Sequence, residues 1–341
     1  MCNLHQELRS LWRWGGRTLF LVLWVTLAMT ASLALAQSTT QTKPQTAPQT
    51  KPEQPPQQDE AVKLSSRLVL VPVSATDASG QPVRDLKASD IVIEEDGRRQ
   101  EVVALGEPGK TPIDLALLVD VSGSTHSQFD FEKQAAVQFI KQLLKPNDAV
   151  SLFSIGITPR MVKTRTTSTD EAIGGLMSIV SSNEPTAFFD AVVEGAQYLD
   201  KSADSGSRRV LLVISDGEEN FSKSNKLEDA LRELQRDDCL FYAINPSGGG
   251  IRLNAISLKG QAVMDSLASE TGGKAFNVIK IEELESVFHQ IAEELKAQYL
   301  FGYYATDEKS GNEFRRITVR APKRPDLRIR ARQGYYSRKS G

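Results

Sequence analysis

Five oxygen-bearing side chains, far apart along the chain, have the chemistry of a site for a hard divalent cation. Asp120, Ser122 and Ser124 alternate in the stretch VDVSGSTHS, Thr186 lies in EPTAFFDAV, and Asp216 follows the apolar run VLLVIS. Two carboxylates and three hydroxyls favour Mg²⁺, with Mn²⁺ or Ca²⁺ as alternatives, over zinc, which prefers His or Cys. The carboxylates roughly neutralise a divalent ion, and the uncharged hydroxyls leave it electrophilic enough to accept a further anionic oxygen.

Each part of this pattern also has a simpler interpretation. Ser122, Ser124 and Ser127 could cap the helix that is expected to follow them. The pair Asp216-Gly217 could form only a turn. A shared site is favoured because all the parts occur in order, with both aspartates at the end of an apolar run.

The apolar runs that precede the two aspartates predict strands of a parallel sheet. IDLALLVDV, DAVSLFSIG, RRVLLVISDG and CLFYAIN are mostly apolar, as is typical of strands covered on both faces. Amphipathic helices are expected between and after these strands, most clearly over residues 284–295. The alternation predicts a doubly wound, mostly parallel, Rossmann-like α/β domain over residues 111–297. Ligands of such domains bind beyond the carboxyl ends of the strands, where Asp120 and Asp216 lie.

The segments on either side of this domain, residues 61–108 and 298–341, contain short runs of period two with turn signals between them. Three or four strands and no helix are expected in the first segment. We expect the two segments to pair into one small β-sandwich, into which the α/β domain is inserted. The eight basic residues between Arg315 and Arg332 alternate with apolar ones, which favours the solvent face of a sheet over a surface for an anionic partner.

The N-terminus has the pattern of an export signal. Three arginines precede an apolar stretch that ends in Ala34-Leu35-Ala36, so residues 1–36 are expected to be a signal peptide cleaved after Ala36. An uncleaved membrane anchor is the alternative; if the signal is cleaved, no membrane span is expected in the mature chain. Residues 37–60 contain Pro, Gln and Thr with no large apolar side chain, which predicts a disordered linker. The folded part is therefore expected outside the cytoplasm, in the periplasm, the cell envelope or the medium.

Composition excludes one class of partner and one kind of cross-link. The formal net charge of −2 gives no signature of nucleic-acid binding. Of the two cysteines, Cys2 belongs to the signal, so Cys239 is left without a disulfide partner. Its place in CLFYAIN predicts a buried core thiol.

The stretches VDVSGSTHS, TAFFDAV and VLLVISDGEEN, in that order and spacing, resemble a von Willebrand factor A (VWA) domain. The metal-ion-dependent adhesion site (MIDAS) of these domains has the pattern D-x-S-x-S, then Thr, then Asp. The resemblance implies that the two serines, and Thr186 in a ligand-engaged state, bind the metal directly, while the aspartates often act through water. Pro185 stands where such loops often have Gly.

The flanking segments resemble a narrower group. VPVSATDASGQPVRDLKASDIVIEEDGRRQEV and YLFGYYATDEKSGNEFRRITVRAP are similar to the exported VWFA-related Acidobacterial domain family. That resemblance adds to the expected fold and says little about biological function.

The resemblance implies adhesion: a protein partner donates an Asp or Glu carboxylate to the open position of the bound metal. The alternative is a structural or assembly component of the cell envelope with a weak or idle metal site. We do not expect an enzyme, because VSGST lacks the G-x-S-x-G pattern, GEPGKT lacks the phosphate-loop spacing, and only His126 lies near the site.

Overall fold

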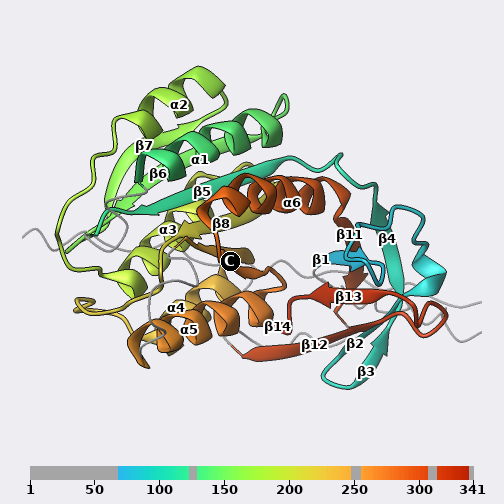
Figure 1. The fold of residues 1–341 in the computed structure, drawn as a ribbon. Helices are drawn as coiled ribbons and strands as arrows, with labels where there is room; N and C mark the ends of the chain where they lie inside the picture. Colours follow the sequence, from blue (N-terminus) through green and yellow to red (C-terminus); the bar gives the residue numbers. More distant parts are fainter. Residues whose placement is uncertain (1–67, 123–128, 247–254, 306–312, 338–341) are drawn as a thin grey trace, which may run out of the picture. The chain divides into compact units, whose positions relative to one another are not determined.

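The computed structural model describes residues 68–122, 129–246, 255–305 and 313–337. Contacts divide the chain after Ala61, and all described residues belong to the unit that follows. A six-stranded sheet of order β10-β9-β8-β5-β6-β7 lies at the centre of this unit, and only its edge strand β7 is antiparallel to its neighbour (Figure 1). The strands are β5 (Ile113–Asp120), β6 (Ala149–Ile155), β7 (Arg160–Thr166), β8 (Arg208–Ile214), β9 (Cys239–Asn245) and β10 (Ala275–Asn277).

Helices cover both faces of this sheet and enclose two apolar cores. The first core contains residues of α1 (Phe129–Leu143), α2 (Thr169–Met177) and α6 (Leu284–Ala297). The second contains residues of α3 (Phe188–Ser202), α4 (Leu227–Arg236) and α5 (Ala255–Thr271). Figure 1 shows α1 and α6 on one side of β5, with α4 and α5 on the other.

The side chains of β5 point alternately to the two faces of the sheet, and both faces are covered by an apolar core. Leu115 and Leu117 contribute to the first core, whereas Ala116 and Leu118 contribute to the second. Successive side chains of a strand point to opposite faces, so a central strand must be apolar throughout.

Two antiparallel four-stranded sheets are built from both flanking segments. One has the order β13-β1-β11-β4 and the other β14-β12-β2-β3. Their strands are β1 (Leu68–Thr76), β2 (Val92–Glu95), β3 (Arg98–Gln100), β4 (Val102–Gly106), β11 (Tyr299–Tyr304), β12 (Phe314–Arg320), β13 (Arg328–Ala331) and β14 (Gly334–Tyr336). The two sheets share a third apolar core that includes Val71, Ile93 and Phe301. This confirms the predicted fold class, with one difference: a short 3-10 helix, Ala88–Asp90, interrupts the first β segment.

The predicted solvent exposure of the basic C-terminal stretch is wrong for two of its arginines, Arg315 and Arg332. Arg315 is buried and donates to Glu95, which also accepts from the hydroxyls of Tyr303 and Tyr335. Arg315 shares its side of β12 with Ile317, which the alternation places on the inner face. The buried Arg332 and the half-buried Arg330 form ion pairs with carboxylates of the α/β domain.

Arg208, at the start of β8, links the two chain segments that join the α/β domain to the sandwich. Its guanidinium donates to Thr111 O at 3.2 Å on the entering segment. It also donates to Leu295 O at 2.7 Å and to Gln298 Oε1 at 3.1 Å on the leaving segment. Both connections are therefore held at the edge of the sheet where the parallel strands begin.

Candidate functional site

The carboxyl end of β5 places Asp120 in the interior, where its side chain has no solvent exposure. Oδ2 accepts a hydrogen bond from the Ser215 hydroxyl at 2.6 Å. Oδ1 accepts from the Ser122 backbone N–H at 2.9 Å and from Thr186 Oγ1 at 3.5 Å. Strands β5 and β8 are neighbours, and Val119 pairs with Ile214. This pairing sets the ends of the two strands, and hence the residues that follow them, side by side.

The loop that carries Thr186 is held through the backbone on both sides of that residue. Its N–H donates to Asn220 Oδ1 at 2.8 Å, and its carbonyl accepts from the N–H groups of Asn220 and Phe221 at 3.2 Å each. The next residue, Ala187, donates to Gly156 O at 2.9 Å. With Pro185 in the loop, the Thr186 hydroxyl still lies within hydrogen-bond distance of Asp120.

Asp216 follows β8 and is also buried, with its Oδ1 accepting from the Glu218 N–H at 3.0 Å. Gly217 adopts a positive φ of 73°, a conformation that glycine allows without strain. A Cβ added to it would lie 2.7 Å from Gly260 O on α5. The turn after Asp216 is thus packed directly against the α5 backbone.

Glu132 on α1 adds a third carboxyl group near Asp120 and Asp216, and we did not predict it from the sequence. It is 1% exposed, and neither of its carboxyl oxygens has a hydrogen-bond partner in the described part of the chain. Burial, followed by the charges of Asp120 and Asp216, raises the pKa of Glu132 to about 8. The neighbouring cation, Lys133, donates instead to Ile179 O and pairs with Asp130.

The surroundings of Asp120 disfavour the charged form of its carboxyl group. Burial raises its pKa to about 6, against hydrogen bonds from Ser215 and Ser122 that lower it, and the charge of Asp216 raises it further. Among the described residues, no Lys or Arg forms an ion pair with Asp120, Asp216 or Glu132. Buried acids that repel one another, with no protein cation among them, fit a site that a divalent ion would neutralise.

The structure brings Asp120, Ser122 and Thr186 together, and it places Asp216 close enough to affect the pKa of Asp120. Ser124 lies outside the described residues, as does His126. Within the described ranges, no three His, Cys, Asp or Glu side chains form a group able to hold a metal by themselves.

A cavity of about 400 Å³ lies beside the turn after Asp216. Its lining includes Phe189, Glu218, Asn220, Lys259 and Val263, so apolar groups and charges of both signs surround it.

Three positioning residues were missed in the sequence: Glu132, Ser215 and Asn220. Glu132 had a signal, because it lies four residues before Ala136 on the apolar stripe of α1, where an acid is out of place. Ser215 and Asn220 had none, because serine and asparagine after a strand are typical of ordinary turns.

The family of the chain was identified by comparison with known proteins. The sequence model of the von Willebrand factor type A domain family matches residues 114–290, and the chain belongs to this family. None of the curated proteins matches it.

Solved structures with a similar fold come from several organisms. The conserved hypothetical protein BatB from Bacteroides thetaiotaomicron is 17% identical, with a TM-score of 0.41 over 54% of this chain and 99% of that chain. The PilB minor pilin from Streptococcus sanguinis is 14% identical, with a TM-score of 0.44 over 55% and 62%. Proximal thread matrix protein 1 from the mussel byssus, with a zinc-occupied MIDAS motif, is 14% identical, with a TM-score of 0.46 over 59% and 49%.

No helix within the described ranges is both long and apolar enough to cross a membrane.

Proposed function

We propose that this protein is an exported binding module that captures a carboxylate of a protein partner through a divalent cation, with Mg²⁺ as the first candidate. Asp120, Ser122, Ser124, Thr186 and Asp216 would hold the cation. The observation that carries the proposal is the group of buried, mutually repelling acids Asp120, Asp216 and Glu132, which has no cationic partner in the described residues. A bound divalent ion would supply the missing positive charge and an electrophilic position for an incoming oxygen anion.

The role that we propose for each side chain follows from its hydrogen bonds. Asp120 has both oxygens engaged by protein donors, so it suits an indirect role in which it orients the hydroxyl of Thr186 and supplies charge. Thr186 is fixed through its backbone, which leaves its hydroxyl available to a cation. Asn220 and Glu218 connect this group to the neighbouring cavity, where the partner's other side chains would bind.

Metal binding is tested by thermal unfolding of the full chain with EDTA, Mg²⁺ or Mn²⁺. We expect either cation to raise the melting temperature of the wild-type chain and Asp120→Ala to abolish the rise. Asp170→Ala is the matched control, because Asp170 is exposed on α2, away from the site, and should leave the response to metal unchanged. A rise of equal size in Asp120→Ala would remove the site assignment.

Partner capture is tested by a pull-down from the cell-envelope fraction of the source organism. We expect any partner retained in Mg²⁺ to be released by EDTA and to bind again when Mg²⁺ is restored. Retention in EDTA, with the metal response of the wild-type chain intact, would favour a structural or assembly role in the envelope.

A further inference from the structure

The sandwich has one side that the described residues leave open. Strand β3 is the last strand of one of its sheets, and β4 is the last strand of the other. Only Glu101 lies between them, so residues 98–106 form an edge of both sheets (Figure 1). Within the described ranges, no strand pairs with the outer side of this segment, and its backbone forms no hydrogen bond with the backbone of a loop or helix. An open edge of this kind is a template for pairing with another strand.

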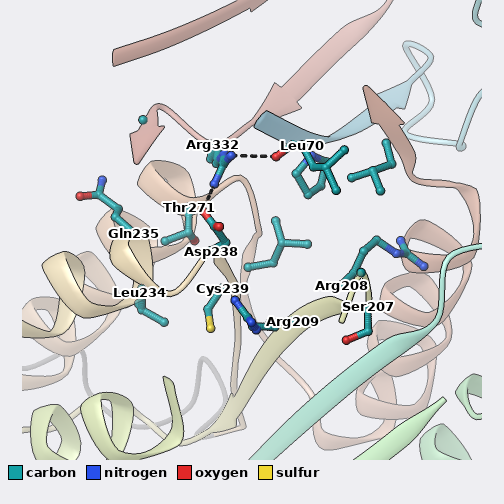
Figure 2. A pocket seen from close by; sticks show the side chains of 15 residues that line it. Leu70, Ser207, Arg208, Arg209, Leu234, Gln235, Asp238, Cys239, Thr271 and Arg332 are labelled. Atoms are coloured by element: carbon teal, nitrogen blue, oxygen red, sulfur yellow. Dashed lines mark hydrogen bonds and ion pairs between the residues drawn. The ribbon is translucent and has the colours of Figure 1, made fainter. Parts of the chain in front are cut away.

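The opposite edge of the sheet that contains β4 lies against the α/β domain. Strand β13 forms that edge, and its Arg330 makes an ion pair with Glu294 of α6. Directly after β13, Arg332 pairs with Asp238 and donates to Leu70 O at 2.7 Å, beside a cavity of about 160 Å³ (Figure 2). Of the two edges of this sheet, β4 is therefore the one that another strand can reach.

The side chains of β4 do little to protect its edge. Edge strands of soluble proteins are usually protected by lysine, proline or a bulge. Strand β4 has an irregular register with β11 next to Val103, but it contains no lysine or proline. The side chain of Val103 is 49% exposed, and that of Leu105 is 39% exposed. Two large apolar side chains on one short, open edge strand favour a surface that another protein covers.

An open groove of about 480 Å³ lies beside the point where β3 continues into β4. Its lining includes Ala88 and Ile91, from the 3-10 helix and the residue after it, and Glu101 and Val102 of the edge segment. Ile91 belongs to the apolar core of the sandwich, and Val102 packs against that core. The groove therefore offers apolar surface and room for a side chain of a strand that pairs with β4.

The charges along the edge segment fit an antiparallel copy of the same segment. Arg99 and Glu107 are exposed, and neither forms an ion pair in the described part of the chain. In an antiparallel pairing of two copies centred on Val103, Arg99 of each copy is opposite Glu107 of the other. Leu105 of each copy is then opposite Glu101 of the other, beside the groove. A pairing centred one residue further along would place Glu101 opposite Glu107, and like charges directly opposite are unfavourable.

We propose that two copies of the chain form a symmetric dimer by pairing their β4 edges antiparallel, centred on Val103. The two four-stranded sheets that contain β4 would join into one sheet that runs through the dimer. The side chain of Leu105 of each copy would lie in the groove of the other. Because the contact is short, the dimer would be reversible. The proposal does not depend on the metal site, although a dimer would carry two such sites and bind a repetitive partner more firmly than a monomer.

Sedimentation equilibrium of the full chain in EDTA measures the association without any contribution of the metal site. We expect a monomer–dimer equilibrium. Arg99→Glu and Glu107→Arg should each weaken the association about tenfold or more, because each substitution sets like charges opposite one another at two symmetric positions. The double variant Arg99→Glu/Glu107→Arg restores opposite charges, so its dissociation constant should return to within about threefold of the wild-type value.

Val103→Cys tests the register of the pairing. In the proposed dimer this position faces itself across the symmetry axis, where opposite Cβ atoms lie about 5 Å apart, close enough for a disulfide after a small adjustment. Oxidation of this variant should therefore give a covalent dimer. Val180→Cys is the matched control, because Val180 is 77% exposed and lies between α2 and α3, outside the edge segment. The wild-type chain gives the background from its own two cysteines.

Four results would overturn the proposal. A wild-type chain that remains monomeric up to about 100 μM would show that the open edge does not pair. Undiminished association of Arg99→Glu would place the contact elsewhere on the chain. Failure of the double variant to recover would show that the two charges do not face each other. A yield of covalent dimer from Val103→Cys no higher than from Val180→Cys would contradict the register.

Discussion

Gly217 and Gly260 lie backbone against backbone, one in the turn after Asp216 and the other on α5. A Cβ on Gly260 would lie 2.6 Å from Asp216 O and 2.8 Å from Gly217 C, and one on Gly217 would lie 2.7 Å from Gly260 O. Backbone atoms cannot move aside as a flexible side chain can, so α5 fixes the position of the Asp216 turn.

Gly260→Ala should therefore displace α5 from this turn. We expect a fall of several degrees in the melting temperature and a smaller rise on adding Mg²⁺ than in the wild-type chain. Gly174→Ala is the matched control, since Gly174 also lies in a helix but has no atom within 4 Å of an added Cβ. The control should be neutral or slightly stabilising, because alanine favours helix more than glycine does. Equal behaviour of the two variants would contradict the role of the Gly217–Gly260 contact.

Glu132→Gln should have opposite effects on the metal-free and metal-loaded protein. Without metal, burial, and then the charges of Asp120 and Asp216, raise the pKa of Glu132 to about 8, so at neutral pH the folded protein must hold a proton that the unfolded chain releases. Glutamine removes this cost, so the free energy of unfolding should rise. With Mg²⁺ present, it removes a charge that attracts the cation, so the stabilisation by Mg²⁺ should shrink and its dissociation constant should increase several-fold. Chemical denaturation in EDTA and in Mg²⁺ measures both effects.

The matched control for these opposite effects is Glu233→Gln. Glu233 is a buried acid on α4 that is paired with Arg236. Its effect should be the same with and without Mg²⁺. A Glu132→Gln variant that behaves likewise would show that Glu132 has no influence on the cation.

The stability of the metal-free protein should fall as the pH rises from about 6 to 8. The ordinary pKa of a glutamate is 4.5, and that of Glu132 in the folded protein is raised to about 8, by burial and then by two neighbouring charges. Between these values the folded state binds a proton that the unfolded state has released, so stability decreases with pH. Asp120, with its pKa raised to about 6, contributes to a decrease below that pH.

Urea denaturation at several pH values, in EDTA and in saturating Mg²⁺, measures this dependence. Mg²⁺ should abolish the decrease, because the cation replaces the protons, and Glu132→Gln should remove its part above pH 6. Constant stability in EDTA from pH 6 to 8 would show that Glu132 ionises normally.

Asn220→Ala should weaken metal binding without touching a proposed ligand. The substitution removes the acceptor for the Thr186 N–H and frees the loop, so the Thr186 hydroxyl would spend less time near Asp120. We expect a several-fold higher dissociation constant for Mg²⁺, and Asn220→Asp, which keeps the acceptor oxygen, should restore most of the affinity. Failure of Asn220→Asp to bind better than Asn220→Ala would contradict the positioning role.

Sequence reasoning reached the parts of the fold that repeat a simple pattern. The apolar strands β5 and β8 and the amphipathic helix α6 were predicted because burial on both faces, or on one stripe, leaves a clear period in the sequence. Strand β7 was missed, since RMVKTRT at a sheet edge has no buried residue to mark it.

The contacts of the predicted site residues could not be predicted from periodic patterns in the sequence. Asp120 and Asp216 were placed at one edge because parallel strands end together, whereas the contact between Thr186 and Asp120 depends on loop hydrogen bonds. Arg315 was wrongly predicted to be exposed, because its burial depends on its ion pair with Glu95, which lies 220 positions away in the sequence. Such distant pairs leave no local pattern.

The clamp that Arg208 forms between Thr111 and Leu295 has a mechanical consequence. Tension applied at the Asp120 edge would be carried to the sandwich by β5 and α6 together, because β5 begins just after Thr111, α6 ends just after Leu295, and Arg208 binds both residues. If β5 is pulled along its own axis, its hydrogen bonds to β6 and β8 are loaded in shear and must break together. Two connections held at one arginine should therefore resist a pulling force better than either connection alone.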